Sequence, residues 1–284
     1  MKPAPALTLC LLFIFAATAI LSPWAYLALH GILHYPFHRY VDRVLMLTAL
    51  GGLELFWRRF GIRSWADVGF GGFRRGKWDM AVGLALGLGT SALFIATTLV
   101  VGGRTLGGAL PIKFLIGVFL GMPILAVIEE FLFRGVVQGI LVRRFGAIGG
   151  IALGSLLFAV IHFLKVPHDF DPHPVTMTSG WQAIGLCFEP LIRLEWWQPR
   201  FGLLIGMGLV LGMAAWRTRY LWVSIGLHAG WIIMGLKIDN QLTSGVPGHW
   251  ASADFSANPL SFIILALVAL AVWKWPLSPT SSSK

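Results

Sequence analysis

Residues 112–142 read IKFLIGVFLGMPILAVIEEFLFRGVVQGILV. This apolar run is long enough to cross a bilayer, and it carries Glu129, Glu130 and Arg134 near its middle. Each charged residue at the centre of a spanning helix costs about 2.5–3.5 kcal/mol on insertion scales, so such residues usually face the interior of a helix bundle and mark function. We therefore expect the rest of the chain to surround this helix.

The two glutamates have different neighbours on that helix. Glu130 and Arg134 are four residues apart, so their side chains stack on one face and can form an ion pair. Glu129 lies about 100° around the helix from Glu130, and a purely structural ion pair does not need this second carboxylate. The three residues together favour a functional site over a structural pair.

Composition predicts an all-α integral membrane protein. Of the 284 residues, 57% are hydrophobic and 12% are charged, a balance typical of polytopic membrane proteins. The net charge of +10 falls in short segments between apolar stretches, which does not indicate nucleic-acid binding. The stretches of spanning length predict about eight transmembrane helices, at residues 7–29, 41–57, 80–101, 112–142, 148–166, 201–216, 220–237 and 260–275.

The distribution of basic residues predicts the topology. With a cytoplasmic N-terminus, most Lys and Arg outside the membrane fall in cytoplasmic segments, as the positive-inside rule requires. Both termini then face the cytoplasm, and a bacterial inner membrane is the expected location. The cytoplasmic segment 58–79, RRFGIRSWADVGFGGFRRGKWD, combines Arg with Trp, which suits either anionic lipid headgroups or a simple topology signal.

Two histidines also lie within predicted spans. His162 is in the span 148–166, and His228 is in the span 220–237. A lone membrane histidine usually satisfies a hydrogen bond between helices, but two of them beside two glutamates favour chemistry. Counted from the inner ends of their spans, Glu129, His162 and His228 lie at depths of roughly 21, 24 and 13 Å. The three converge only if the span 220–237 is tilted or begins deeper in the membrane.

Glutamate and histidine together suit amide hydrolysis. A buried carboxylate takes a proton from water, one imidazole orients that water, and a second imidazole donates to the oxyanion that develops on the carbonyl. The same residue types would equally hold Zn²⁺, whose bound water becomes a nucleophile near neutral pH. The sequence contains no HExxH motif and no G-x-S-x-G turn, so neither a soluble-type metalloprotease nor a serine nucleophile is supported.

Three motifs, each on its own span, resemble the CPBP family of intramembrane proteases. Residues 129–134, EEFLFR, match EExxxR, residues 158–162, FAVIH, match FxxxH, and residues 224–231, SIGLHAGW, look like the third motif. The family includes type II CAAX prenyl endopeptidases and bacteriocin-immunity relatives. The resemblance covers roughly residues 112–237.

The resemblance implies a fold of eight helices around an intramembrane active site that opens toward the cytoplasm. It implies that Glu129 activates water with His162, that His228 contributes to the oxyanion hole, and that Glu130, Arg134 and Phe158 support the site. The glutamic mechanism requires no cofactor, whereas a metal-dependent one would use Zn²⁺ on Glu129, His162 and His228. The implied division is N-terminal helices in 1–111, a protease core in 112–237, and an outer loop, last helix and cytoplasmic tail in 238–284.

The third motif departs from the family pattern at one position. The family usually has Asn or a similar polar residue four positions after the histidine, where this chain has Ile232. The Trp231 indole N–H or the Ser224 hydroxyl would then have to serve as the second oxyanion donor. Loss of one such donor costs about 10²–10³ in rate in a soluble protease.

The sequence thus predicts an intramembrane endopeptidase that cleaves a membrane-associated protein or peptide, with CAAX-type processing implied by resemblance. Its partners are that substrate and the lipid bilayer, and no nucleic acid. The first alternative is a catalytically weakened or inactive immunity or scaffold protein of the same fold. The second is a proton-coupled carrier, but the sequence shows no inverted repeat of the kind expected there.

Overall fold

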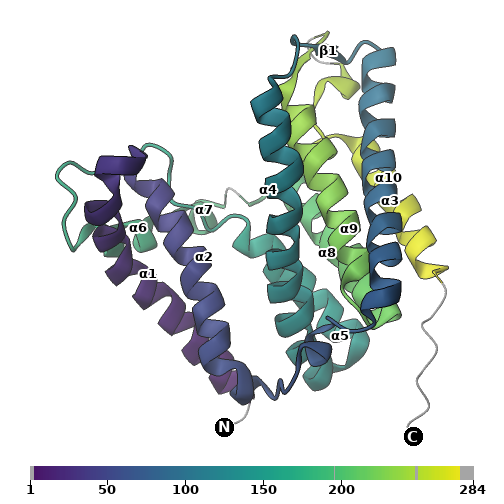
Figure 1. Cartoon of the computed structure of the whole chain (residues 1–284). Coiled ribbons are helices and arrows are strands. Elements are labelled where there is room, and N and C mark those ends of the chain that lie inside the picture. Colours follow the sequence, from purple (N-terminus) through teal and green to yellow (C-terminus); the bar gives the residue numbers. More distant parts are fainter. Residues whose placement is uncertain (1–2, 195, 247–248, 276–284) are drawn as a thin grey trace, which may run out of the picture. The chain divides into compact units, whose positions relative to one another are not determined.

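The computed structural model describes residues 3–194, 196–246 and 249–275, which are mostly helical (Figure 1). The α-helices are α1 (Pro3–Leu33), α2 (Phe37–Phe56), α3 (Phe73–Val100), α4 (Ile112–Glu130), α5 (Gln138–Ile161), α6 (Ser179–Cys187), α7 (Glu189–Ile192), α8 (Pro199–Thr218), α9 (Trp222–Gly230) and α10 (Pro259–Trp273). Two π-helices, η3 (Phe131–Val137) and η4 (Trp231–Ile238), continue α4 and α9. Short 3₁₀ turns are η1 (Trp57–Phe60), η2 (Trp65–Val68), η5 (Asp239–Gln241) and η6 (Trp250–Ser252), and the strands are β1 (Arg104–Leu106) and β2 (Leu242–Ser244).

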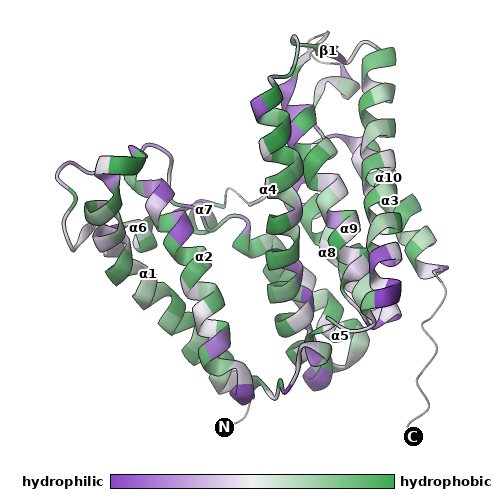
Figure 2. Ribbon diagram, in the orientation of Figure 1, coloured by the Kyte–Doolittle hydropathy of each residue, from purple (hydrophilic) through white to green (hydrophobic). Residues whose placement is uncertain are grey.

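The predicted all-α membrane fold is confirmed, since every predicted span overlaps a helix. Within the described residues, four helical segments are long and apolar enough to cross a membrane, namely Pro5–Leu33, Trp65–Val100, Ile112–Ile161 and Pro199–Thr218. Figure 2 shows hydrophobic residues along most of α1 and α4. On α4, Ile116, Leu120 and Ile124 are each more than half exposed, as expected of side chains that face lipid. The chain is an integral membrane protein.

Gly146 divides the long segment Ile112–Ile161 into two helices. Its φ of 74° and ψ of 175° leave the helical region inside α5, in a conformation that is essentially restricted to glycine. A Cβ atom at Gly150 would lie 2.5 Å from the backbone of Val142, so the chain folds back on itself at this point. The break agrees with the predicted boundary between the spans 112–142 and 148–166.

The chain forms two compact units that are discontinuous in sequence, whereas the predicted division was linear. One unit consists of Met1–Arg63 and Val160–Trp197, and the other of Ser64–Ala159 and Gln198–Lys284. The end of the predicted cytoplasmic tail, residues 276–284, lies outside the described residues.

The unit Met1–Arg63 with Val160–Trp197 is built on α1, which packs against α2 and α6. The hydroxyl groups of Thr18 and Thr48 lie 2.7 Å apart and link α1 to α2. The carboxylate of Asp171 accepts a hydrogen bond of 2.7 Å from the backbone N–H of Phe37. This contact satisfies a free amide at the start of α2.

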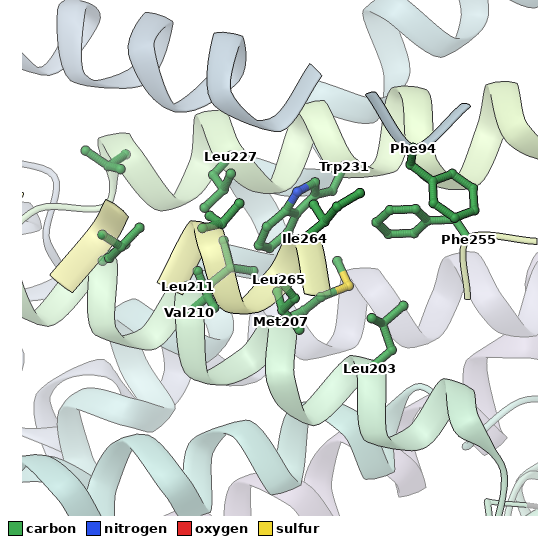
Figure 3. Close-up of a cluster of buried hydrophobic side chains, with 14 of the residues drawn as sticks. Phe94, Leu203, Met207, Val210, Leu211, Leu227, Trp231, Phe255, Ile264 and Leu265 are labelled. Atoms are coloured by element: carbon green, nitrogen blue, oxygen red, sulfur yellow. The ribbon is translucent and has the colours of Figure 1, made fainter. Parts of the chain in front are cut away.

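In the unit Ser64–Ala159 with Gln198–Lys284, α9 is the central helix and contacts α3, α4 and α8. Its hydrophobic core joins residues of α8, α9 and α10 (Figure 3). Leu227 and Trp231 lie in this core with Met207 and Leu265. The antiparallel pair of β1 and β2 joins the segment before α4 to the segment after η4.

Glycines allow α3 and α9 to approach closely. A Cβ atom at Gly226 would lie 2.1 Å from the carbonyl oxygen of Met80, and one at Gly87 would lie 2.5 Å from that of Leu227. Cβ atoms at Gly83 and Gly230 would lie 2.4 and 2.6 Å from the backbone of the facing helix. Such pairs of small residues four apart bring membrane helices into backbone contact. Because Gly226 and Gly230 flank His228, this contact also fixes where that histidine lies.

Gly226→Ala should therefore lower the thermal midpoint of the purified protein in detergent. The added methyl group meets backbone rather than a movable side chain, and overpacking of this kind costs about 1–3 kcal/mol. Gly89→Ala is the matched control on α3, because its Cβ meets no atom within 4 Å and alanine is the better helix former. Equal midpoints for the two variants would contradict the close contact of α3 and α9.

Candidate active site

Glu130, the last residue of α4, joins α4 to α9. Its Oε1 lies 2.9 Å from a guanidinium nitrogen of Arg134 and 2.8 Å from Nδ1 of His228. The relative exposures of Glu130, Arg134 and His228 are 0%, 5% and 2%. The structure thus contains the ion pair that the sequence predicted, and it adds His228 as a third member.

Both helices that supply this network, α4 and α9, continue into a π-helix. The π-helix η3 begins directly after Glu130 and contains Arg134, and η4 begins three residues after His228. π-Helical turns are rare and frequently occur at functional sites. Sequence reasoning missed both, although each contains a glycine, Gly135 or Gly235, which is an unfavourable residue within a helix.

Phe158 packs against the two partners of Glu130, Arg134 and His228. The guanidinium carbon of Arg134 lies 4.2 Å from the centre of the Phe158 ring, a cation–π geometry. The rings of Phe158 and His228 meet edge to face with their centroids 5.9 Å apart. Phe158 is 1% exposed, so an apolar wall covers this side of the network.

Glu129 approaches His228 from the other side. Its Oε2 lies 3.6 Å from Nε2 of His228, and its side chain is 21% exposed, whereas that of Glu130 is 0% exposed. His228 therefore stands between two carboxylates, with one ring nitrogen toward each. Of the two carboxylate side chains, that of Glu129 is the more exposed, although its Oε2 atom is itself buried.

The charges of the four groups balance when His228 carries a proton on each nitrogen. In that form the imidazolium is a donor at both positions, and the positive charges of His228 and Arg134 match the negative charges of Glu129 and Glu130. Such a balance matters here, because an unpaired charge inside a membrane bundle is costly.

His162 belongs to the unit that contains Val160–Trp197 and follows directly after the end of α5. The other predicted site residues belong to the unit that contains Ser64–Ala159 and Gln198–Lys284. The predicted action of His162 on water beside Glu129 stays a prediction.

Trp231 and Ser224, the two predicted substitute oxyanion donors, both donate hydrogen bonds to other groups within the helix bundle. The indole N–H of Trp231 donates to the hydroxyl of Thr90 at 3.3 Å, and its ring lies in the hydrophobic core. The hydroxyl of Ser224 donates to the carbonyl of Leu221 at 2.9 Å. The predicted role of either group as an oxyanion donor stays a prediction.

Ile232 lies in an apolar cluster beside α4. It is 6% exposed and clusters with Ala126 and Ala229. Ala126 precedes Glu129 by three residues, about one helical turn. A polar side chain at position 232 would therefore lie within about one turn of the two glutamates.

No group of three or more His, Cys, Asp or Glu side chains in the described part of the chain is arranged to hold a metal ion. Glu129 and His228 supply two adjacent donors, and Oε1 of Glu130 already contacts Arg134 and His228. A catalytic zinc site needs three protein ligands. The predicted Zn²⁺ ligand set of Glu129, His162 and His228 therefore remains a prediction.

Residues 108–234 match a family model, that of the Type II CAAX prenyl endopeptidase Rce1-like proteins. The matched segment contains all three motifs, so the resemblance to type II CAAX prenyl endopeptidases is confirmed there. No curated protein and no solved structure matches the chain.

Glu130→Gln should destabilise the protein more than Glu129→Gln. Removal of the buried carboxylate leaves Arg134 without its counter-charge, which typically costs about 3–5 kcal/mol. Glu129 makes only the longer contact with His228, at 3.6 Å, and its side chain is 21% exposed, so its neutralisation should cost less than that of Glu130. The measurement is the thermal midpoint of each purified variant in detergent, and the double variant Glu130→Gln/Arg134→Gln should recover part of the loss. Equal midpoints for the two single variants would show that Glu130 does not hold this network together.

Proposed function

We propose that the chain is an intramembrane peptidase, on the basis of the match of residues 108–234 to the Rce1-like family model. It hydrolyses a peptide bond in a membrane-associated protein or peptide. The observation that carries the proposal is the placement of His228 between a fully buried carboxylate, Glu130, and a partly exposed one, Glu129.

In this mechanism Glu129 is the general base. Its carboxylate takes a proton from a water molecule, the resulting hydroxide attacks the carbonyl carbon of the scissile bond, and the C–N bond then breaks. The proton held by Glu129 passes to the departing amine, so the step needs no other acid. The predicted role of His162 is to orient the same water.

His228 stabilises the charge that develops on the carbonyl oxygen. Its Nδ1 is held by Glu130, so the ring is fixed with Nε2 toward Glu129. An Nε2–H in this position donates to the oxyanion without moving, which is the arrangement that lowers the barrier most effectively. Arg134 keeps Glu130 ionised, because it neutralises that carboxylate in an apolar setting.

We further propose a glutamic mechanism, CAAX-type processing and a bacterial inner membrane, with both termini in the cytoplasm. The positive-inside distribution of Lys and Arg supports the orientation. The metal-dependent alternative would place Zn²⁺ on Glu129, His162 and His228, where it would supply the activated water.

A second candidate function is a weakened or inactive immunity or scaffold protein. Ile232 favours it, because this side chain belongs to an apolar cluster at the position where the family usually supplies a polar group. This candidate is also supported by the hydrogen bonds of the Trp231 indole N–H to Thr90 and of the Ser224 hydroxyl to the carbonyl of Leu221, which would have to break before either group could act as a substitute donor.

Glu129→Gln should abolish proteolysis and leave the protein folded. The membrane and secreted proteomes of the native host would be compared for the wild type and the variant at matched expression, with new peptide termini as the readout. We expect termini that appear only with the wild type, and they would identify the substrate. Identical termini, together with a host phenotype that survives Glu129→Gln, would favour the scaffold.

Ile232→Asn should raise the rate of substrate cleavage by about 10²-fold, because an amide N–H restores a donor to the oxyanion. Once a substrate is known, kcat is measured for the wild type, Ile232→Asn and Ile232→Leu. Leu is the control, since it keeps the apolar contact with Ala126. A rate for Asn no higher than that for Leu would show that the missing amide does not limit this protein.

A further inference from the structure

The first two turns of α3 present a face of aromatic and basic side chains. Phe73 and Trp78 are 75% and 68% exposed, and Arg74 and Lys77 are exposed between them. At 100° per residue, these four side chains fall within about 140° of the helix circumference. We call them the aromatic–basic face, which belongs to the unit Ser64–Ala159 with Gln198–Lys284.

The opposite side of the same turns packs against α9, and this contact fixes the direction of the face. A Cβ atom at Gly76 would lie 2.3 Å from Nε1 of Trp222, and the indole N–H of Trp222 donates to the carbonyl of Gly71 at 2.7 Å. Two turns later, a Cβ atom at Gly83 would lie 2.4 Å from the carbonyl oxygen of Val223. The aromatic–basic face therefore points away from the helix bundle.

Along α3 this face continues into exposed apolar side chains. Arg74, Trp78 and Val82 are spaced four residues apart, so they lie on one side of the helix over successive turns. Val82 is 48% exposed, and Leu93 and Val100 farther along this side are 57% and 86% exposed. The order of cation, aromatic ring and aliphatic side chain matches the order of headgroup, interface and hydrocarbon in a bilayer.

The length of α3 places its beginning in the headgroup layer. The helix has 28 residues and is therefore about 42 Å long, whereas the hydrocarbon core of a bilayer is about 30 Å thick. The predicted span begins at residue 80, so residues 73–79 extend about 10 Å beyond the hydrocarbon. Figure 2 shows hydrophilic residues at the beginning of α3 and mainly hydrophobic ones along the rest of it.

The cations of this face are free to meet an external anion. Neither Arg74 nor Lys77 forms an ion pair with another described residue, whereas Nε of Arg75 lies 3.7 Å from Oδ2 of Asp79. Three cations and one carboxylate give residues 73–79 a net positive charge. Basic side chains close to an anionic membrane surface each add to the attraction. A soluble anion would not account for the two exposed aromatic rings, whereas such rings are enriched at the membrane interface.

We propose that the aromatic–basic face binds the headgroups of anionic phospholipids in the cytoplasmic leaflet. The sequence of this segment suits a lipid site and a simple topology signal equally. The exposed side chains that run without a break from Arg74 to Val82 favour the lipid site, because a topology signal needs charge alone. This binding does not require peptidase activity.

The test uses the full chain in nanodiscs of phosphatidylcholine and phosphatidylglycerol in equal parts, with bromine on the acyl chains of one lipid or the other. Bromine quenches tryptophan fluorescence at short range. The signal of Trp78 is the difference between a protein and the same protein with Trp78→Phe. The charge variants are Arg74→Gln and Lys77→Gln. Lys113→Gln is the matched control, because it removes an exposed cation at the predicted outer surface.

We expect brominated phosphatidylglycerol to quench Trp78 more strongly than brominated phosphatidylcholine does. The ratio of the two association constants, obtained by varying the lipid proportions, should fall about fivefold in each charge variant and stay unchanged in Lys113→Gln. Each protein is compared with its own nanodiscs without bromine, so differences in intrinsic fluorescence do not affect the ratio.

Equal quenching by the two lipids in the wild type would overturn the proposal. A preference for phosphatidylglycerol that persists in the double variant Arg74→Gln/Lys77→Gln would overturn it as well, because the preference would then arise elsewhere in the chain. The third contrary result is a preference that disappears on addition of glycerol phosphate but not of chloride at equal ionic strength, since the face would then bind a soluble anion.

Discussion

A carboxylate that is completely buried among membrane helices must be neutralised where it lies, and Glu130 is in this situation. Its Oε1 contacts Arg134 in the π-helix that continues its own helix and His228 on α9. The contacts that neutralise Glu130 therefore also hold α4 against α9. Arg134 in turn lies over Phe158. The desolvation of these groups is compensated only when all of them are in place.

The sequence predicted the helices well, because apolar stretches of spanning length are long and unambiguous. It also singled out Glu129, Glu130, Arg134 and His228, because ionisable residues stand out in an apolar run, and the structure brings these four side chains into one network. The depth of His228 in the membrane was harder to predict. Counted from Arg219, His228 lies less deep than Glu129. In the structure, however, Leu221 packs beside Gly135, which comes well before Arg143, the residue from which the depth of Glu129 was counted. The helix α9 thus begins deeper than the inner end of its neighbour, which was one of the two conditions stated for convergence.

Three features of the site were not predicted, and each depends on neighbours that are distant in sequence. The contact of α3 and α9 needs glycines on both helices, and neither pair alone shows which helix it meets. The engagement of the Trp231 indole by Thr90 depends on the rotation of α3. Spacing alone also cannot show that Ile232 lies against Ala126, because that contact depends on how α4 and η4 turn about their axes.

The length of the π-helix η3 determines whether two contacts, one made by Glu130 before it and one made by Gln138 after it, can form at the same time. A π-turn holds one residue more than an α-turn, and each residue added to or removed from a helix rotates everything after it by about 100°. Downstream of η3, the amide of Gln138 donates to the carbonyl of Gly212 at 2.9 Å and so secures α8. The number of residues between Glu130 and Gln138 thus sets the angle around the helix axis between the charged network and the contact with α8. Its side chains can vary within apolar limits, but insertion or deletion of one residue would point one of the two contacts in the wrong direction.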